Sequence, residues 1–334
     1  MTTVVEDFAL CDLHELAKKA ACRYPLIADS VSLLSLSENA TFLVCRETSD
    51  ERAVLRIYRS GYNTLVEIRS ELAWMAALRE TTPVRTPAVL TALSGTAVIA
   101  VHHPATGSRH CAVFEYLPGV SPSGQDLSAC FEMLGKISAC LHNHSASWHA
   151  PSWFRRRRWD IATTIGTKPA WGDWRNAPDI DVEGCKLVER VCDRIAQSLG
   201  RAVPSPDSFG LVHADLRLAN VLVRGDELSL IDFDDCGFSW HLWDLATALT
   251  FMEDDPHVGT HVEAWCRGYR TCRSIDQKQW SHVPDLLMLR RVLILAWLGS
   301  HVGSMTATEE GPGYTRATYE LCELYLGDPR RLLQ

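Results

Sequence analysis

The 334-residue sequence lacks the features that mark several classes of protein. Its twelve cysteines include no Cys-x-x-Cys pair, which argues against a zinc site or a small disulfide scaffold. It has no Gly-x-x-x-x-Gly-Lys-Ser/Thr motif, which disfavours a P-loop nucleotide fold. Residues 1–10 have no basic segment followed by an apolar one, and Arg290 and Arg291 interrupt the apolar stretch 286–302. We therefore expect no signal peptide, no membrane-spanning helix and a cytoplasmic location with reduced thiols.

An excess of positive charge is also missing. The 33 Lys and Arg residues are outnumbered by 41 Asp and Glu residues, which gives a formal net charge of -8. Binding to nucleic acid needs a basic face that neutralises phosphates, so no nucleic-acid partner is expected. The one strongly basic run, residues 155–158, is interpreted as a solvated helix face.

The order of apolar patterns predicts two lobes, as the chain length also favours. Residues 1–116 are expected to form a small β-rich lobe with one long helix, which Pro83 terminates. A cluster of Pro and Gly residues at 117–124 marks the boundary, and residues 117–334 are expected to be mainly helical. The predicted strands are 41–45, 53–58, 96–102 and 111–116, and the predicted helices are 65–79, 127–142, 264–269 and 286–298.

A hairpin in the second lobe carries the clearest chemical signal. Two apolar runs, 221–223 and 228–231, flank the polar segment 224–227. A turn centred near Asp226 would set Asn220 opposite Asp232, with Cβ atoms about 5 Å apart. An amide oxygen and a carboxylate are hard donors, so the mouth of the hairpin is predicted to hold magnesium.

An acidic residue stands just before this hairpin. Phosphoryl transfer needs a carboxylate that orients a hydroxyl and accepts its proton, near metal ions that neutralise the phosphates. Asp215 lies five residues before Asn220, and this spacing, with Asp-Phe after the hairpin, is that of protein-kinase catalytic and metal loops. Arg217 could supply positive charge to the transferring phosphoryl group.

These motifs resemble those of the aminoglycoside phosphotransferase and choline kinase superfamily, above all its branch of bacterial stress-response and homoserine-kinase-like proteins. The resemblance extends over most of the chain and implies an α+β, bilobal, protein-kinase-like fold. The segments that carry it are 37–41, 54–59, 70–74, 114–119, 134–137, 213–220, 231–237 and 243–246.

The resemblance also implies roles for individual residues. Asp215 would be the catalytic base, Asn220 and Asp232 would hold Mg²⁺, and the backbone of Glu115, Tyr116 and Leu117 would meet the adenine of ATP. Asp244 would brace the catalytic loop from a buried position, and His213 would help to orient it.

Two departures from the family pattern concern the phosphates. Arg56 replaces the usual lysine of the β lobe, and arginine can still pair with phosphate oxygens. Glu71 is its expected partner, with Glu67 one turn earlier as the alternative. The loop 36–41 contains no glycine, so its approach to the nucleotide would depend on Ser37 and Asn39.

The acceptor is left open by the sequence. The expected activity is transfer of phosphate from ATP to a hydroxyl of a small molecule, either an amine-bearing antibiotic or an amino alcohol such as homoserine. A protein serine/threonine kinase of the stress-response type is the alternative, although no Ala-Pro-Glu segment follows the metal loop. The family builds its acceptor pocket after that loop, and acidic groups there would favour a cation. The residues considered for this pocket are Trp240, His241, Trp243, Asp254 and Asp255.

Overall fold

A computed structural model describes residues 10–26, 28–37, 39–46, 49–105, 107–122, 126–201 and 204–333. Its strands are β1 (Ser30–Leu36), β2 (Ala40–Cys45), β3 (Arg52–Ile57), β4 (Val98–His103), β5 (Gly107–Glu115), β6 (Phe209–Val212), β7 (Val221–Arg224), β8 (Glu227–Leu230) and β9 (Gly237–Trp240). Its α-helices are α1 (Leu10–Ala21), α2 (Leu65–Thr81), α3 (Leu127–Ser147), α4 (Ile161–Thr164), α5 (Val182–Leu199), α6 (Trp243–Ala248), α7 (Val258–Arg270), α8 (Gln277–Ser281), α9 (Val283–Ser300), α10 (Met305–Glu310) and α11 (Tyr314–Gly327). Short 3-10 helices lie at Trp174–Asn176, Leu218–Asn220 and Pro329–Leu333.

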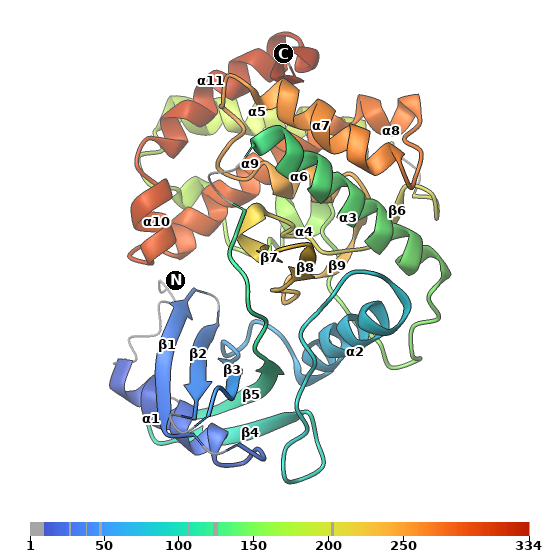
Figure 1. Cartoon of the computed structure of the whole chain (residues 1–334). Coiled ribbons are helices and arrows are strands. Elements are labelled where there is room, and N and C mark those ends of the chain that lie inside the picture. Colours follow the sequence, from blue (N-terminus) through green and yellow to red (C-terminus); the bar gives the residue numbers. More distant parts are fainter. Residues whose placement is uncertain are drawn as a thin grey trace.

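The N-terminal part is an antiparallel sheet between two helices. Within the described residues its strand order is β1-β2-β3-β5-β4 (Figure 1). Because side chains alternate along a strand, β3 turns Leu55 and Ile57 into the core beneath α1. Its other face carries Val54 and Arg56 toward α2 and the cleft. This alternation is what delivers a guanidinium to the functional site.

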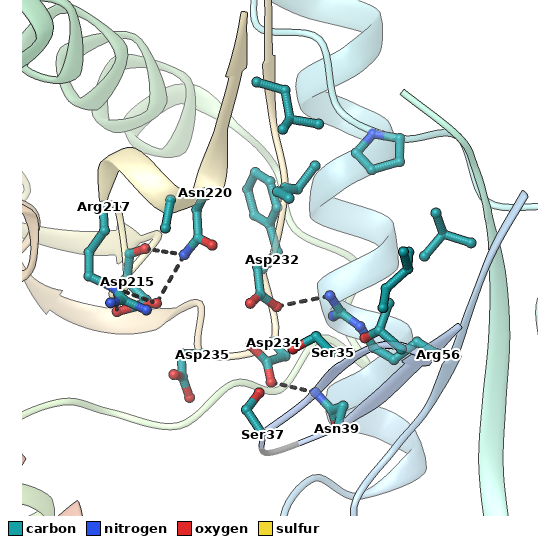
Figure 2. Close-up of a pocket in the computed structure, with 18 of the residues that line it drawn as sticks. Ser35, Ser37, Asn39, Arg56, Asp215, Arg217, Asn220, Asp232, Asp234 and Asp235 are labelled. Carbon is teal, nitrogen blue, oxygen red and sulfur yellow. Dashed lines mark hydrogen bonds and ion pairs between the residues drawn. The ribbon is translucent and has the colours of Figure 1, made fainter. Parts of the chain in front are cut away.

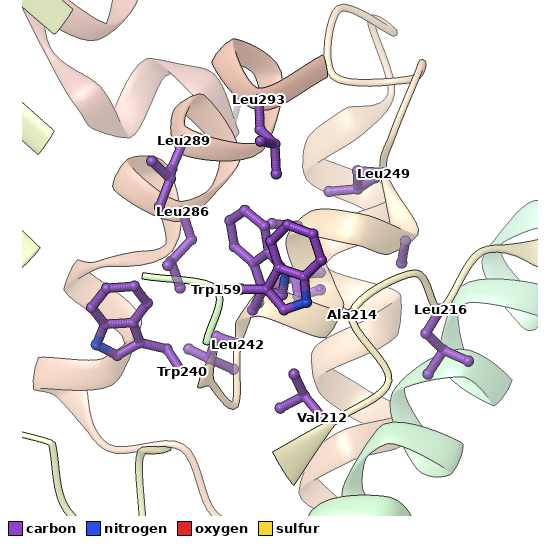
Figure 3. Close-up of a cluster of buried hydrophobic side chains, with 14 of the residues drawn as sticks. Trp159, Val212, Ala214, Leu216, Trp240, Leu242, Leu249, Leu286, Leu289 and Leu293 are labelled. Atoms are coloured by element: carbon purple, nitrogen blue, oxygen red, sulfur yellow. The ribbon is translucent and has the colours of Figure 1, made fainter. Parts of the chain in front are cut away.

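The C-terminal part is helical, and the chain crosses to it after β5 along one extended stretch (Figure 1). Its centre is α9, whose residues 283–298 are all buried. Leu286, Leu289 and Leu293 of this helix pack in a cluster that also contains Trp159 (Figure 3). Helices α3 and α7 approach each other closely at Gly135, where a Cβ would lie 1.9 Å from the carbonyl oxygen of Trp265.

The α+β, bilobal, kinase-like architecture is confirmed. Each predicted strand and helix overlaps an observed one, but β5 begins four residues earlier than predicted, α3 ends five residues later and α7 begins six residues earlier. The elements without a predicted counterpart include α1, β1, α4, α5, β6 and β9. The boundary between residues 116 and 117 stays a prediction. Residues 1–9, on which most of the signal-peptide argument depends, and residues 123–124 of the predicted boundary cluster lie outside the described residues. No helix in the described ranges is long and apolar enough to cross a membrane.

Candidate active site

A cleft of about 540 Å³ lies between the sheet and the helical part. Every residue that the sequence proposed for catalysis, nucleotide or metal binding lines it. Figure 2 shows Arg56 and Asn39 entering from the sheet side, and Asp215, Arg217 and Asn220 from the helical side. The predicted residues on its wall are Ser37, Asn39, Arg56, Glu71, Glu115, Tyr116, Leu117, Asp215, Arg217, Asn220 and Asp232.

The predicted hairpin exists, but its register differs by one residue from the expected one. Strands β7 and β8 pair Val221 with Leu230, so the turn is centred between residues 225 and 226. Asn220 therefore lies opposite Ile231, whose N–H donates to the Asn220 carbonyl oxygen at 3.0 Å. The expected pairing of Asn220 with Asp232 is wrong, because Gly225 at φ 58° shifts the turn centre toward the first strand. Asp232 follows one residue later and still lines the same cleft.

Asp215 is held from three sides by nitrogen donors. The Asn220 amide donates to its Oδ2 at 3.0 Å, Arg290 donates to its Oδ1 at 2.8 Å, and Arg217 lies 3.2 Å from Oδ1. Burial raises the pKa of Asp215, but the charges of Arg217 and Arg290 outweigh that effect, so the pKa lies below its usual value. Arg290 comes from α9 and was not predicted for the site, since sequence spacing gives no sign that it reaches residue 215.

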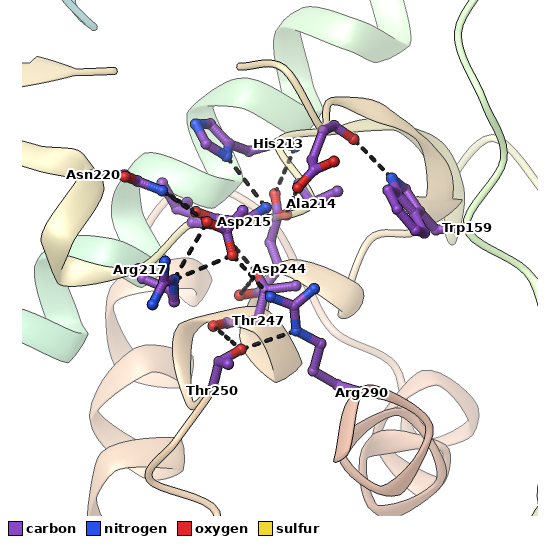
Figure 4. A network of polar contacts seen from close by, with 12 residues as sticks. Trp159, His213, Ala214, Asp215, Arg217, Asn220, Asp244, Thr247, Thr250 and Arg290 are labelled. Atoms are coloured by element: carbon purple, nitrogen blue, oxygen red, sulfur yellow. Dashed lines mark hydrogen bonds and ion pairs between the residues drawn. The ribbon is translucent and has the colours of Figure 1, made fainter. Parts of the chain in front are cut away.

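The loop that carries Asp215 is strained and braced. Ala214 has φ 66°, which costs a residue other than glycine about 1–3 kcal/mol. The buried carboxylate of Asp244 accepts the N–H of Ala214 at 2.8 Å and that of His213 at 3.2 Å (Figure 4). The His213 ring then bridges the Asp215 N–H and the Ile231 carbonyl oxygen. Through these contacts Asp244 and His213 hold the loop before Asp215 in place, as the resemblance led us to expect.

Arg56 joins the sheet to the metal loop. Its guanidinium lies 3.2 Å from Glu71 Oε1 on α2 and 2.8 Å from Asp232 Oδ1. Of the two glutamates considered, Glu71 is the partner, because Glu67 completes the capping box of α2 with Thr64. The contact with Asp232 was not predicted.

Replacing Arg56 by methionine is expected to raise the KM for ATP about ten-fold, since one hydrogen bond between charged groups contributes about 1.5–3 kcal/mol. Steady-state kinetics with varied ATP measures this. Arg46→Met is the matched control, because Arg46 forms an exposed pair with Glu51 away from the cleft. Equal KM values for the two variants would contradict a role for Arg56 in nucleotide binding.

The loop between β1 and β2 contacts the residues that follow Asp232. The Asn39 side chain, which is 6% exposed, donates to Asp234 Oδ2 at 2.6 Å and accepts the Arg59 N–H at 3.1 Å. The Asn39 side chain is thus already engaged within the protein, so Asn39 could approach a nucleotide only through its backbone. Burial, together with the carboxylates of Asp232 and Asp235, raises the pKa of Asp234 well above its usual value.

The basic run 155–158 is not the solvated helix face that was predicted. It is an extended segment, and Arg156 is 7% exposed. The Arg156 guanidinium donates to the carbonyl oxygens of Asp234 and Cys236. Trp159 adds a bond from its indole N–H to the Asp235 carbonyl oxygen at 2.7 Å. The prediction from charge alone is wrong, because a buried guanidinium can donate hydrogen bonds to the carbonyl oxygens of an irregular loop.

The predicted hinge residues lie on the cleft wall where β5 ends: Glu115 is the last residue of the strand, and Tyr116 and Leu117 follow it. The Glu115 carboxylate lies 2.9 Å from both Arg79 and Arg85. Partial burial raises its pKa, but the Ala88 N–H and Arg85 outweigh burial and leave the pKa below its ordinary value. Among the described residues, the Leu117 N–H donates to no backbone carbonyl.

The residues proposed for the acceptor pocket do not line the cleft. Trp240, His241 and Trp243 are buried in the helical part, and neither Asp254 nor Asp255 is on the cleft wall. The helical wall is instead completed by Asp235, from the named segment 231–237, and by residues that the sequence analysis missed, which come from distant segments and share no motif. The missed residues are Trp171, Thr250, Phe251, Arg290, Ile294, Trp297 and Thr306.

The donor set at the hairpin mouth fits a magnesium ion. The Asn220 amide nitrogen is used by Asp215, which leaves the amide oxygen for a ligand. Arg56 contacts only Oδ1 of Asp232, and the Asp232 side chain is 39% exposed. Magnesium prefers such oxygen donors and usually takes one or two carboxylates together with substrate phosphates.

Comparison with known proteins agrees with this geometry. Residues 32–275 match the phosphotransferase enzyme family. The chain is 25% identical over 308 residues to an amicoumacin kinase of Bacillus subtilis (strain 168), covering 89% of this chain and 88% of that protein. It is 29% identical over 216 residues to a homoserine kinase of Granulibacter bethesdensis, covering 62% and 64%.

Solved structures extend the comparison. The structure of a microcompartment-associated aminopropanol kinase is 39% identical, with a TM-score of 0.86 and coverage of 94% of this chain and 98% of that one. An amicoumacin kinase in complex with AMP-PNP and Ca²⁺ shares the fold at 24% identity, with a TM-score of 0.76 over 93% of each chain. The chain therefore belongs to the phosphotransferase enzyme family and is a small-molecule kinase.

Proposed function

We propose that this kinase transfers the γ-phosphate of ATP, with Mg²⁺, to the hydroxyl of a small amino alcohol that carries an ammonium group and no carboxylate. The observation that supports it best is the convergence of Asp215, Asn220 and Asp232 on one cleft that is itself small and rich in carboxylates. The likeness to an aminopropanol kinase at 39% identity supports the acceptor class. The twelve free cysteines fit a reducing compartment, and we propose the cytoplasm.

In this proposal each residue has a separate task. Asp215 orients the acceptor hydroxyl and accepts its proton, while Arg217 faces the transferring group. Arg56 holds phosphate oxygens, the backbone of Leu117 meets adenine, and Asn220 and Asp232 hold the metal ion. When bound, Mg²⁺ would neutralise charge on the phosphates.

The size of the cleft favours a small acceptor over an antibiotic. A cleft of 300–1,000 Å³ typically encloses one drug-sized ligand, and this one has about 540 Å³. A nucleotide already fills a site of that order. Three aromatic side chains on the cleft wall limit the space that remains for the acceptor. They come from separate segments and are Trp171, Phe251 and Trp297.

The charges around Asp215 favour a cation over a carboxylate such as that of homoserine. Both nearby arginines, Arg217 and Arg290, already contact Asp215, so an acceptor carboxylate would compete with that residue. Asp235 lies on the Asp215 side of the cleft in Figure 2, is 6% exposed and accepts the Tyr62 hydroxyl at Oδ1. We assign it as the carboxylate that faces the acceptor's ammonium group, where it would favour the charged amine.

A screen with labelled ATP tests the proposal. We expect robust labelling of 1-amino-2-propanol, and kcat/KM at least about 100-fold lower for 1,2-propanediol, in which a hydroxyl replaces the ammonium group. Homoserine, an aminoglycoside and generic protein substrates complete the panel. Labelling of protein with no labelling of any small acceptor would overturn the proposal in favour of a protein kinase. Equal kcat/KM values for 1-amino-2-propanol and 1,2-propanediol would show that the acceptor needs no ammonium group.

A further inference from the structure

A second cavity of about 320 Å³ lies behind the catalytic loop, in the helical part of the molecule. It shares no lining residue with the cleft among the described residues. Its wall combines apolar side chains from β9, α7 and α9 with a polar rim from α8 and the segment 205–208. The residues are Ser205, Ser208, Trp240, His241, Leu242, Tyr269, Ile275, Asp276, Lys278, Gln279, His282 and Leu286.

Two buried nitrogens on this wall have no hydrogen-bond partner among the described residues, Trp240 Nε1 and His241 Nε2, and the first of them is a donor. Trp240 is 8% exposed, and its indole nitrogen makes no hydrogen bond within the described part of the chain. Figure 3 shows the indole ring at the edge of the buried cluster, beside Leu242 and Leu286, which also line the cavity. Buried N–H groups are almost always paired, so this one calls for an acceptor atom.

The same wall is linked to the catalytic base by hydrogen bonds. The hydroxyl of Tyr269 lies 3.0 Å from His142 Nδ1, and His142 Nε2 lies 3.0 Å from Asp244 Oδ2. Asp244 in turn holds the N–H groups of His213 and Ala214, directly before Asp215 (Figure 4). The chain from cavity to base is therefore unbroken.

A second, parallel link runs through stacked rings. His241, on the cavity wall, stacks on His142 with ring centroids 4.6 Å apart. Burial lowers the pKa of His142 to about 3 and that of His241 to about 2, so both rings are neutral at physiological pH. The stack can therefore persist without charge repulsion.

We propose that this cavity is an effector site for a small uncharged molecule with an apolar body and one oxygen, which accepts the Trp240 indole N–H and alters turnover through Tyr269, His142 and Asp244. The volume lies at the lower end of small-ligand pockets. The apolar wall takes the body of the ligand, and the indole nitrogen fixes its oxygen.

Cyclohexanol is a suitable probe, since it has this chemistry and no ring current of its own. Titrated into ¹⁵N-labelled protein, it is expected to shift the indole N–H resonance of Trp240 downfield and to saturate. Loss of that resonance in Trp240→Phe gives the assignment. The Ile275 backbone amide, at the cavity, follows binding in both proteins, and we expect about ten-fold weaker affinity in Trp240→Phe.

Two further measurements decide the proposal. Ile275→Trp should fill the cavity and abolish the shifts. Saturating cyclohexanol should change kcat for 1-amino-2-propanol by about five-fold, the lower end of usual allosteric coupling, with KM for ATP unchanged.

Each negative result would contradict one defined part of the proposal. Shifts that never saturate, or that Ile275→Trp leaves intact, would overturn the site. Saturable binding with an unchanged rate would overturn the effector role. The binding arm needs no acceptor, so it stands apart from the proposed function if 1-amino-2-propanol is not a substrate.

Discussion

Replacing Asp215 by asparagine is expected to lower kcat by about 10³–10⁴-fold, because a neutral amide cannot accept the proton of the acceptor hydroxyl. Asparagine has nearly the same shape and can still accept from the Arg290 guanidinium, which now contacts Oδ1 at 2.8 Å. In the proposed arrangement the nucleotide would lie on the other side of the cleft, against Arg56 and the residues that end β5. Its dissociation constant should therefore change little.

The two quantities must be measured separately. Single-turnover transfer of labelled phosphate gives the chemical step, and calorimetric titration with a non-hydrolysable ATP analogue gives affinity. Asp226→Asn is the matched control, since Asp226 lies at the tip of the β7–β8 turn outside the cleft. Turnover within a few-fold of the original in Asp215→Asn would remove Asp215 from its role, whatever happens to affinity.

Arg290→Met is expected to lower kcat by about 100-fold with KM for ATP unchanged. Arg290 is 2% exposed and is itself positioned by Thr250, whose hydroxyl accepts from Nε at 2.9 Å. Without it, Asp215 keeps Arg217 and Asn220 but loses its shortest contact to a charged partner. Misplacing a reacting group by about 1 Å can cost that much in rate.

A conservative variant separates positioning from folding. Arg290→Lys keeps the charge but loses the planar fork, so it should recover part of the lost kcat. Arg194→Met removes another guanidinium from the helical part, where Arg194 binds carbonyls of α11 outside the cleft. Denaturant unfolding of all three variants measures how much of the fall in kcat comes from a loss of stability. A fall in kcat that tracks the loss of stability equally in Arg290→Met and Arg194→Met would reject the positioning role.

The sequence allowed most of the fold to be predicted, and also a set of residues that the structure brings together on one cleft wall, because both depend on local patterns. The predicted strands follow alternating apolar residues, and α2 follows an apolar period that Pro83 ends. Asp215, Asn220 and Asp232 lie within 18 residues, so a single hairpin brings them together. Even there the register was misjudged by one residue, since turn centres depend on a single glycine conformation.

What the sequence could not reveal depends on tertiary contacts between distant segments. Arg290 reaches Asp215 across 75 positions, and Arg56 reaches Asp232 across 176. Trp240 and His241 follow the metal loop in sequence, yet β9 carries them into the core. By contrast α5 could have been found, because Val188, Val191 and Ile195 recur at helical spacing on its buried side.

The contact between Arg56 and Asp232 has a consequence for the order of events at the enzyme. The Arg56 guanidinium is a counter-ion within the protein for the Asp232 carboxylate, which is proposed to receive magnesium. A divalent ion without a nucleotide would have to compete with the Arg56 guanidinium for the Asp232 carboxylate, and it would bring no new partner for that guanidinium. A magnesium–nucleotide complex offers phosphate oxygens to Arg56 at the same moment as it takes the Asp232 oxygen, so metal and nucleotide would enter as one unit.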